Sequence, residues 1–335
     1  MINVVTRKQA PAPKRANAPG ELPGQNSTTS KGDLGMNLEQ AYYELKFENE
    51  FLTSKADAFQ TLFEKLMSMA YKADFMPCRP WGKVGDKKND GFLKSERRLF
   101  QVYAPNEMEA SKAIRKITDD FEGAKEHWGK LFDKWTFVHN AIDGLPPHVQ
   151  KLLLEFENAN TGIELGPWCM VELREIFRRL SDEDKQSWFG LAPTEETKAK
   201  LGLKDLQIVL ERIAGDATTE LTPVKDVPAR KIEANALSEA VSTLLKQGMV
   251  KASLVQDFFD KWYDGTLGER LAKTFKDKYV ALRKTHPPNV IYQEIQSWAG
   301  GDQRGTPEHE LAVLTVIAYY FERCDIFEEP RRDTI

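Results

Sequence analysis

The sequence predicts an α/β domain with a small mixed sheet flanked by helices, followed by an all-α domain. Over residues 38 to 180, segments with helical periodicity alternate with short runs of branched and aromatic residues, an order typical of α/β proteins. After residue 230 the pattern is almost wholly helical. We therefore expect a disordered basic tail at residues 1–36, an α/β domain at 37–214, a linker at 215–228 and a helical domain at 229–335.

Composition excludes several classes of protein. The 335 residues include 47 Lys and Arg against 51 Asp and Glu, a net charge of −4, so a nucleic-acid site could only be a local basic patch. Cys78, Cys169 and Cys324 lie far apart without CxxC spacing, which favours a reducing compartment and argues against structural zinc. No apolar run reaches the roughly eighteen residues of a membrane span, and the start lacks the apolar core of a secretory signal. We expect a cytoplasmic protein with no membrane partner.

The first 71 residues divide into a tail and a helix. Residues 1–36 are rich in Pro, Gly, Ser and Asn and are locally basic, so we expect a disordered tail that keeps the protein soluble or contacts nucleic acid. From Leu38 to Tyr71, apolar residues recur at three- and four-residue steps, which predicts a helix. Glu64 and Gln60 lie off its apolar face, one turn apart. Glu64 either assists a metal ion at the segment that follows or belongs to a solvated helix face.

A hairpin is predicted between residues 85 and 105, and it is the first place to look for a functional site. Asp90 and Gly91 are followed by a polar turn, and the run from Leu99 to Tyr103 is typical of a half-buried strand. One residue in two faces the same side of a strand. We therefore expect Asp90 and Gln101 to share one edge of the sheet.

The turn-rich loop at residues 74–82 and the hairpin that follows it form the most basic ordered part of the chain, and Trp81 and Phe92 are interleaved with its cations. Such a segment either contacts the phosphates of a nucleic acid or is a solvated hairpin tip. The basic residues are Arg79, Lys83, Lys87, Lys88, Lys94, Arg97 and Arg98.

The remaining elements follow from periodicity. Helices are expected at 108–132, 148–158, 168–180, 203–213, 237–246, 254–262, 267–283, 290–298 and 308–327, and strands at 134–140 and 163–165. Lys112 and Lys116 lie four residues apart on the polar side of the first of these helices. The last helix is apolar most of the way round, so it is the buried centre of a helical domain or a protein interface.

Most familiar catalytic motifs are missing. The chain has no GxSxG elbow, no GxxxxGK[ST] loop and no GxGxxG after a strand. Its five histidines lack metal-ligand spacing, and His139 is interpreted as a hydrogen-bonded residue at a strand end. The hairpin remains. A divalent ion that hydrolyses a phosphodiester needs oxygen ligands on a rigid edge and a basic surrounding for the phosphate, and Asp90, Gln101 and Glu64 could supply the oxygens.

With these residues the segment from 39 to 180 resembles the PD-(D/E)xK nuclease superfamily, in the Mrr-like branch where Gln replaces the second acid. The resemblance implies a restriction-endonuclease-like fold and a Mg²⁺- or Mn²⁺-dependent endonuclease acting on double-stranded DNA. It makes Asp90 the metal carboxylate and Gln101 the second ligand, and Asp86 matches a GDxxxDG spacing. Where the family has lysine this chain has Tyr103, which carries no fixed cation. Lys112 or Lys116 would then supply the charge.

The C-terminal region, quoted from Leu311 to Glu328, resembles the helical module of effectors from bacterial ABC-three-component systems. This resemblance implies docking to an SMC- or Rad50-like ABC ATPase and a small adaptor, in defence against phages or plasmids. Two alternatives stay open: an inactive nuclease fold that only binds DNA or protein, marked by Tyr103, and a structural or assembly subunit of a mobile element. A homodimer is also left open.

Overall fold

The computed structural model describes residues 36–78, 88–217, 231–301, 305–323 and 326–328. Within these ranges no helix combines the length and the apolar character that crossing a bilayer requires. The predicted tail, most of the predicted linker, and the candidate residues Arg79, Lys83, Asp86 and Lys87 lie outside the described residues.

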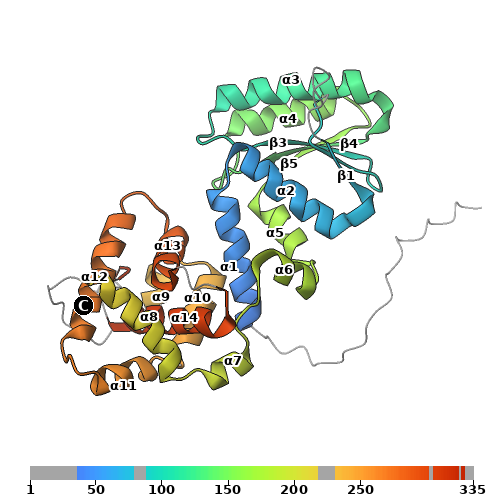
Figure 1. The fold of residues 1–335 in the computed structure, drawn as a ribbon. Coiled ribbons are helices and arrows are strands. Elements are labelled where there is room, and N and C mark those ends of the chain that lie inside the picture. Colours follow the sequence, from blue (N-terminus) through green and yellow to red (C-terminus); the bar gives the residue numbers. More distant parts are fainter. Residues whose placement is uncertain (1–35, 79–87, 218–230, 302–304, 324–325, 329–335) are drawn as a thin grey trace, which may run out of the picture. The chain divides into compact units, whose positions relative to one another are not determined.

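A five-stranded mixed sheet forms the centre of the N-terminal region (Figure 1). The first three strands in sheet order are antiparallel and the last three are parallel, so the predicted small mixed sheet is confirmed. The strands follow one another in chain order: β1 (Phe75–Pro77), β2 (Gly91–Leu93), β3 (Arg98–Tyr103), β4 (Lys134–His139) and β5 (Glu164–Trp168).

The edge strand β1 was not expected from the sequence. It is three residues long and ends in Pro77, which has no N–H to donate. A proline is tolerated on an edge strand because one side of that strand has no neighbour. Only Phe75 of the three residues is buried, so a short strand with a single anchoring side chain leaves little trace in a hydrophobic pattern.

Helices cover both faces of the sheet (Figure 1). On one face α3 and α4 cover side chains that include Leu99 and Phe137, and on the other α2 and α5 cover Phe100 and Val138. Neighbouring residues of one strand thus enter different cores, as the two-residue period of a strand requires. The helices are α1 (Leu38–Thr53), α2 (Ala56–Tyr71), α3 (Ala110–Trp128), α4 (Pro147–Ala159) and α5 (Met170–Arg178).

The single helix expected over residues 38–71 is in fact two. The break falls at Ser54 and Lys55, and Ala56 has a positive φ of 46°. The N–H of Ala56 donates to the carbonyl of Ala104, just after β3, at 2.7 Å. A tertiary hydrogen bond therefore replaces one that a continuous helix would make. It also fixes the start of α2 against the sheet.

The described residues after α5 form helices, and the predicted all-helical C-terminal region is confirmed. The central helix is α14, in which every residue from His309 to Phe321 is buried. Of the two interpretations of this apolar helix, the core is the one the structure confirms. The helices are α6 (Asp182–Phe189), α7 (Glu195–Lys200), α8 (Leu203–Gly215), α9 (Lys231–Ala234), α10 (Glu239–Met249), α11 (Ser253–Lys261), α12 (Leu267–Leu282), α13 (Pro288–Gly300) and α14 (Pro307–Arg323).

Helix α10 lies against α14 at very short range. A Cβ atom added at Gly248 would lie 2.7 Å from the carbonyl oxygen of Leu314 and 2.8 Å from the Cβ of Ala318. Both of these atoms are fixed to the backbone of α14. The close contact between the two helices therefore depends on the absence of a side chain at position 248.

Two helices from the N-terminal part of the sequence contact the C-terminal helices. Helix α8 contacts α11, α12, α13 and α14, and α1 contacts α10 and α13. Across the second contact, the Asn289 amide donates to Glu48 at 2.7 Å, and the Gln293 amide donates to the carbonyl of Leu45 at 2.9 Å. The division of the chain at residues 215–228 stays a prediction.

Candidate metal and phosphate site

Backbone hydrogen bonds hold Asp90 at the entrance to β2. Its N–H donates to the carbonyl of Phe100 at 2.9 Å, and the side chain of Asn89 accepts the N–H of Gly91 at 2.8 Å. A Cβ at Gly91 would lie 2.5 Å from the ring of Phe75, so a side chain at this position would displace that buried ring. The packing of the hairpin therefore favours glycine directly after Asp90.

Three donors converge on the carboxylate of Asp90, which is 5% exposed. Oδ2 accepts the Gln101 amide at 2.6 Å and the N–H of Val102 at 2.7 Å. Oδ1 accepts the amide of Gln60 at 3.0 Å. The structure thus brings Asp90 and Gln101 together, as expected from their spacing, although Gln101 lies on the central strand and not at an edge of the sheet.

The amide of Gln101 is only half satisfied. Its side chain is 2% exposed, and its Oε1 has no hydrogen-bond partner among the described residues. A buried carbonyl oxygen without a donor costs about 1–3 kcal/mol. Such an atom beside a buried carboxylate calls for an explanation, and a cation is one that both oxygen atoms would favour.

Gln60 is the contact that sequence reasoning missed. The spacing of apolar residues along α2 placed Gln60 outside the apolar face. Glu64 is half-buried and lies one turn further on, on the same side of the helix. The periodicity could show that the two residues share a face. It could not show which of them reaches Asp90, because that depends on how α2 crosses the hairpin.

The described residues contain no group of three or more His, Cys, Asp or Glu side chains placed to hold a metal ion. A site here would use one buried carboxylate, that of Asp90, with the amide oxygen of Gln101. Such a set suits Mg²⁺, which keeps several waters and takes only one or two carboxylates from the protein. It does not suit zinc, which takes four ligands from nitrogen, sulfur and carboxylate.

Tyr103 occupies the end of β3, beside His139 of β4. It is half-buried, and its ring centroid lies 5.8 Å from that of Phe137. The side chain thus packs against the aromatic residues of the α3 and α4 face. The structure gives it an aromatic packing partner, and Lys112 of α3 lies near enough to interact with it electrostatically.

The two lysines named for the missing charge have different partners. Lys112 is exposed and pairs with Glu109 at 2.6 Å, within its own helix. Lys116 pairs at 2.7 Å with Asp120, which is fully buried on α3. The second ammonium on Asp120, at 2.9 Å, is that of Lys88, so two candidate cations meet at one carboxylate.

The other described cations of the hairpin differ in burial: Arg98 is buried against the sheet, whereas Lys94 and Arg97 are exposed. Arg98 is 8% exposed and donates to Thr136 of β4 at 2.7 Å, while it pairs with Glu96 and with Glu164 of β5. It therefore links three strands. Arg97 is exposed and pairs with Asp133. Contact of these two residues with nucleic acid stays a prediction.

His139 is a buried strand-end residue, as its sequence context indicated. It is 2% exposed, and its Nδ1 accepts the N–H of Ala141 at 3.2 Å. The hydrogen of the neutral imidazole is therefore assigned to Nε2. Burial lowers the pKa of His139 to about 4, and the nearby Glu172 only partly opposes this.

This pKa predicts a pH dependence of stability. Between pH 6.5, the ordinary pKa of histidine, and a pH of about 4, His139 is protonated in the unfolded chain but stays neutral in the folded chain. The free energy of unfolding should therefore fall as the pH falls through this window, by roughly 3 kcal/mol in total. Urea unfolding of the wild type and of His139→Gln from pH 7 to pH 4.5 measures it. The stability difference between the two proteins should shift steadily in favour of the variant, and a constant difference would contradict the assignment.

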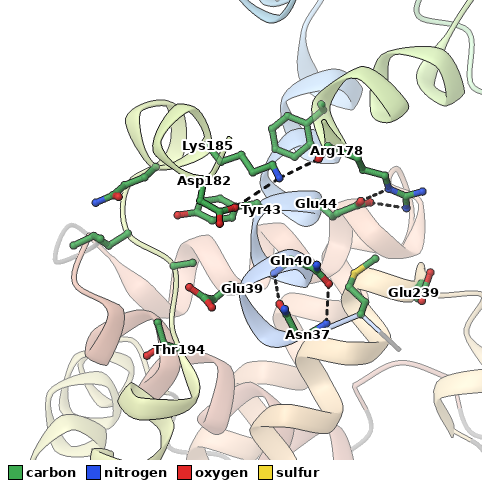
Figure 2. Close-up of a pocket in the computed structure, with 15 residues that line it drawn as sticks. Asn37, Glu39, Gln40, Tyr43, Glu44, Arg178, Asp182, Lys185, Thr194 and Glu239 are labelled. Carbon is green, nitrogen blue, oxygen red and sulfur yellow. Dashed lines mark hydrogen bonds and ion pairs between the residues drawn. The ribbon is translucent and has the colours of Figure 1, made fainter. Parts of the chain in front are cut away.

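A separate pocket of about 550 Å³ lies between α1, α6 and the segment around Ala192 (Figure 2). Several of its charged residues are paired: Arg178 with Glu44, and Lys185 with Asp182 at 4.0 Å, while Lys185 also donates to the carbonyl of Arg178 at 3.2 Å. None of its lining residues belongs to the hairpin. The pocket is thus a feature distinct from the Asp90 site.

The fold and the site together define an α/β protein that carries a buried acid and amide on a hairpin and continues into a helical domain. Residues 204–328 match the family model described as C-terminal domain 10 of the ABC-three component (ABC-3C) systems. The C-terminal resemblance is thereby confirmed, and the match begins in α8. No curated protein and no solved structure matches the chain. The nuclease resemblance of the N-terminal region stays a prediction.

Proposed function

We propose that the chain is the effector of a bacterial conflict system of the ABC-three component type, and that its α/β region cleaves double-stranded DNA with Mg²⁺ or Mn²⁺. The C-terminal match supports the first part. The second part rests on one observation: the Oε1 of Gln101, buried beside the buried carboxylate of Asp90, has no hydrogen-bond partner in the described part of the chain. Under this proposal the enzyme is an endonuclease that acts against phage or plasmid DNA.

A cation shared with Asp90 would require the Gln101 amide to turn over. In the structure its nitrogen faces Asp90 and its oxygen has no partner among the described residues. Turning the amide over would place the oxygen towards the carboxylate, where two oxygens repel unless a cation lies between them. A bound divalent ion would polarise the phosphate and activate water. Asp90 would hold that ion, and Gln101 would complete its protein ligands.

Gln60 should matter as a positioning residue for the metal carboxylate. Replacing it by leucine removes the donor to Oδ1 of Asp90, and loss of such an outer partner typically weakens metal affinity by about 10–100-fold. We expect Gln60→Leu to weaken Mn²⁺ binding about tenfold in calorimetric titration. Gln207→Leu, at an exposed glutamine of α8 that bonds only Glu211 among described residues, is the control. Equal affinities in both variants would remove Gln60 from the site.

The activity itself is tested by plasmid cleavage. Supercoiled plasmid is incubated with the full chain in Mg²⁺, Mn²⁺ or EDTA, with and without the proteins encoded beside it. We expect nicked or linear products only with a divalent ion. An effector tolerated by its own cell should be restrained, so products should increase when the partner ATPase and adaptor are present. Absence of products in every condition would overturn the nuclease.

The C-terminal domain is proposed to dock onto the ATPase and the adaptor. Because α14 is buried in the chain's own core, we place the docking surface on the helices around it. We further propose that this domain begins at α8, since α8 contacts α14 and the family match starts there. Co-purification of the three proteins tests the docking.

One observation favours a second candidate, a nuclease fold that binds without cutting. Tyr103 packs on Phe137 in place of a lysine, and Lys116 is engaged by Asp120. In that case DNA or protein binding should be independent of metal ions. The same cleavage assay, run beside a gel-shift assay in EDTA, separates the two functions.

A further inference from the structure

The buried carboxylate of Asp120 holds two lysines that come from distant parts of the sequence. Its side chain has no solvent exposure and lies on α3, in the helix layer over one face of the sheet (Figure 1). Oδ1 contacts the ammonium of Lys88 at 2.9 Å, and Oδ2 contacts that of Lys116 at 2.7 Å. A buried carboxylate must be paired to remain charged, and here it is paired twice.

The charge of this cluster faces outward. The side chains of Lys88 and Lys116 are 41% and 35% exposed, while that of Asp120 is not exposed at all. Two positive groups therefore reach the surface over one buried negative group, so these three side chains together carry one more positive than negative charge. Because each ammonium contacts a different oxygen of the same carboxylate, the two are held close together and in fixed positions.

The helix is shaped to admit Lys88. A Cβ at Gly123 would lie 2.7 Å from Cγ of Lys88, so the lysine stem lies directly against the backbone of α3. Lys88 has a positive φ of 62° and stands two residues before Asp90. Asp120 thus ties α3 to the segment that carries the metal carboxylate.

We propose that Lys88 and Lys116, held by Asp120, form a seat for one phosphate group of a nucleic-acid strand beside the Asp90 site. The inference rests on the proposed function and adds to it a binding residue pair and the residue that positions it. Two ammonium groups at a fixed spacing are suited to a phosphate. They would supply the cationic charge that Tyr103 cannot.

The test measures binding of a labelled 20-base-pair DNA duplex to the full chain in EDTA, where a metal-dependent nuclease is silent. The main variant replaces the whole cluster by neutral groups of similar shape: Lys88→Met, Lys116→Met and Asp120→Asn. It removes two positive charges and one negative charge, a net change of one. The matched control is Lys151→Met on α4, an exposed lysine that pairs with Glu155 four residues on and gives the same net change.

Losing one phosphate contact should make the plot of log affinity against log salt shallower by about 1, which corresponds to about tenfold in affinity at 0.1 M salt. We expect this of the triple variant and less than a twofold change from Lys151→Met. The single variants Lys88→Met and Lys116→Met each leave Asp120 one partner and so should fold. Each single variant should lower the log of the duplex affinity. Because the two lysines contact the same phosphate, the two decreases added together should exceed the decrease in the triple variant.

Equal salt slopes in the triple variant and the control would overturn the seat, even if the wild type cleaves plasmid with Mg²⁺. Loss of binding in the triple variant together with an absence of cleavage by the wild type would leave the seat standing and overturn the nuclease. A wild type that binds no duplex under any condition would overturn both. The seat and the proposed reaction therefore fail in different ways.

Discussion

Asp90→Asn should abolish metal-dependent cleavage by the full chain. Asparagine has nearly the shape of aspartate, and its one carbonyl oxygen can still accept two of the three hydrogen bonds that converge on this position. It cannot offer a divalent ion a negative charge. Removing even an outer partner of a metal ligand costs about 10–100-fold, so loss of the buried ligand itself should reduce the cleavage rate by at least about 100-fold.

The measurement is the rate of plasmid nicking in Mg²⁺ and in Mn²⁺ under conditions where the wild type is active. Asp119→Asn is the matched control, because Asp119 lies exposed on α3 and the substitution changes the charge equally. The control should cleave like the wild type. Duplex binding in EDTA should be retained by Asp90→Asn. An unchanged cleavage rate in Asp90→Asn would remove this carboxylate from the mechanism.

Gly248→Val should destabilise the C-terminal helices by about 3 kcal/mol, because inserting atoms into a filled core forces the backbone to move. The new Cβ would meet the carbonyl oxygen of Leu314 and the Cβ of Ala318, both fixed to α14. Neither atom can turn away as the end of a flexible side chain could. The helices α10 and α14 would have to separate.

Urea unfolding followed by circular dichroism measures this loss. Gly215→Val is the control, since a Cβ there meets nothing within 4 Å and the two residues differ by only about 0.5 kcal/mol in helix propensity. We expect the control to unfold within about 0.5 kcal/mol of the wild type. Similar stabilities for both variants would show that α10 and α14 can separate without loss. The Gly248 variant should also capture less of the partner ATPase if docking needs an intact helical domain.

The sequence anticipated those parts of the site that depend on local geometry. The strand at residues 98–103 and the turn before it follow from residue type, and the two-residue period of a strand then places Gln101 where it can meet Asp90. The helical character of the C-terminal region and the burial of its last helix likewise follow from composition and period. In each case the information lies within about twenty consecutive residues.

The contacts that the sequence did not reveal are those between distant elements. Gln60 meets Asp90 only because α2 crosses the hairpin, and Lys88 meets Asp120 across 32 residues of chain. Arg98 looked like one more surface cation, yet its place on β3 directs it to β4 and β5. Periodicity indicates which face a residue occupies. It does not indicate what is packed against that face.

The position of α1 has a consequence for how the chain unfolds. On one side the ring of Phe47 stacks on that of Phe177 of α5, with 4.4 Å between the ring centroids. The ring of Phe51 packs edge-on against that of Phe59 of α2, with 5.1 Å between the centroids. On the other side α1 bonds Asn289 and Gln293 of α13. If the α/β part separated from the helical part, α1 would stay with one of them. Its face towards the other part would then be exposed to solvent. Heat should melt both parts in a single cooperative transition, and any recombination that exchanged the α/β part would have to bring a helix equivalent to α1 with it.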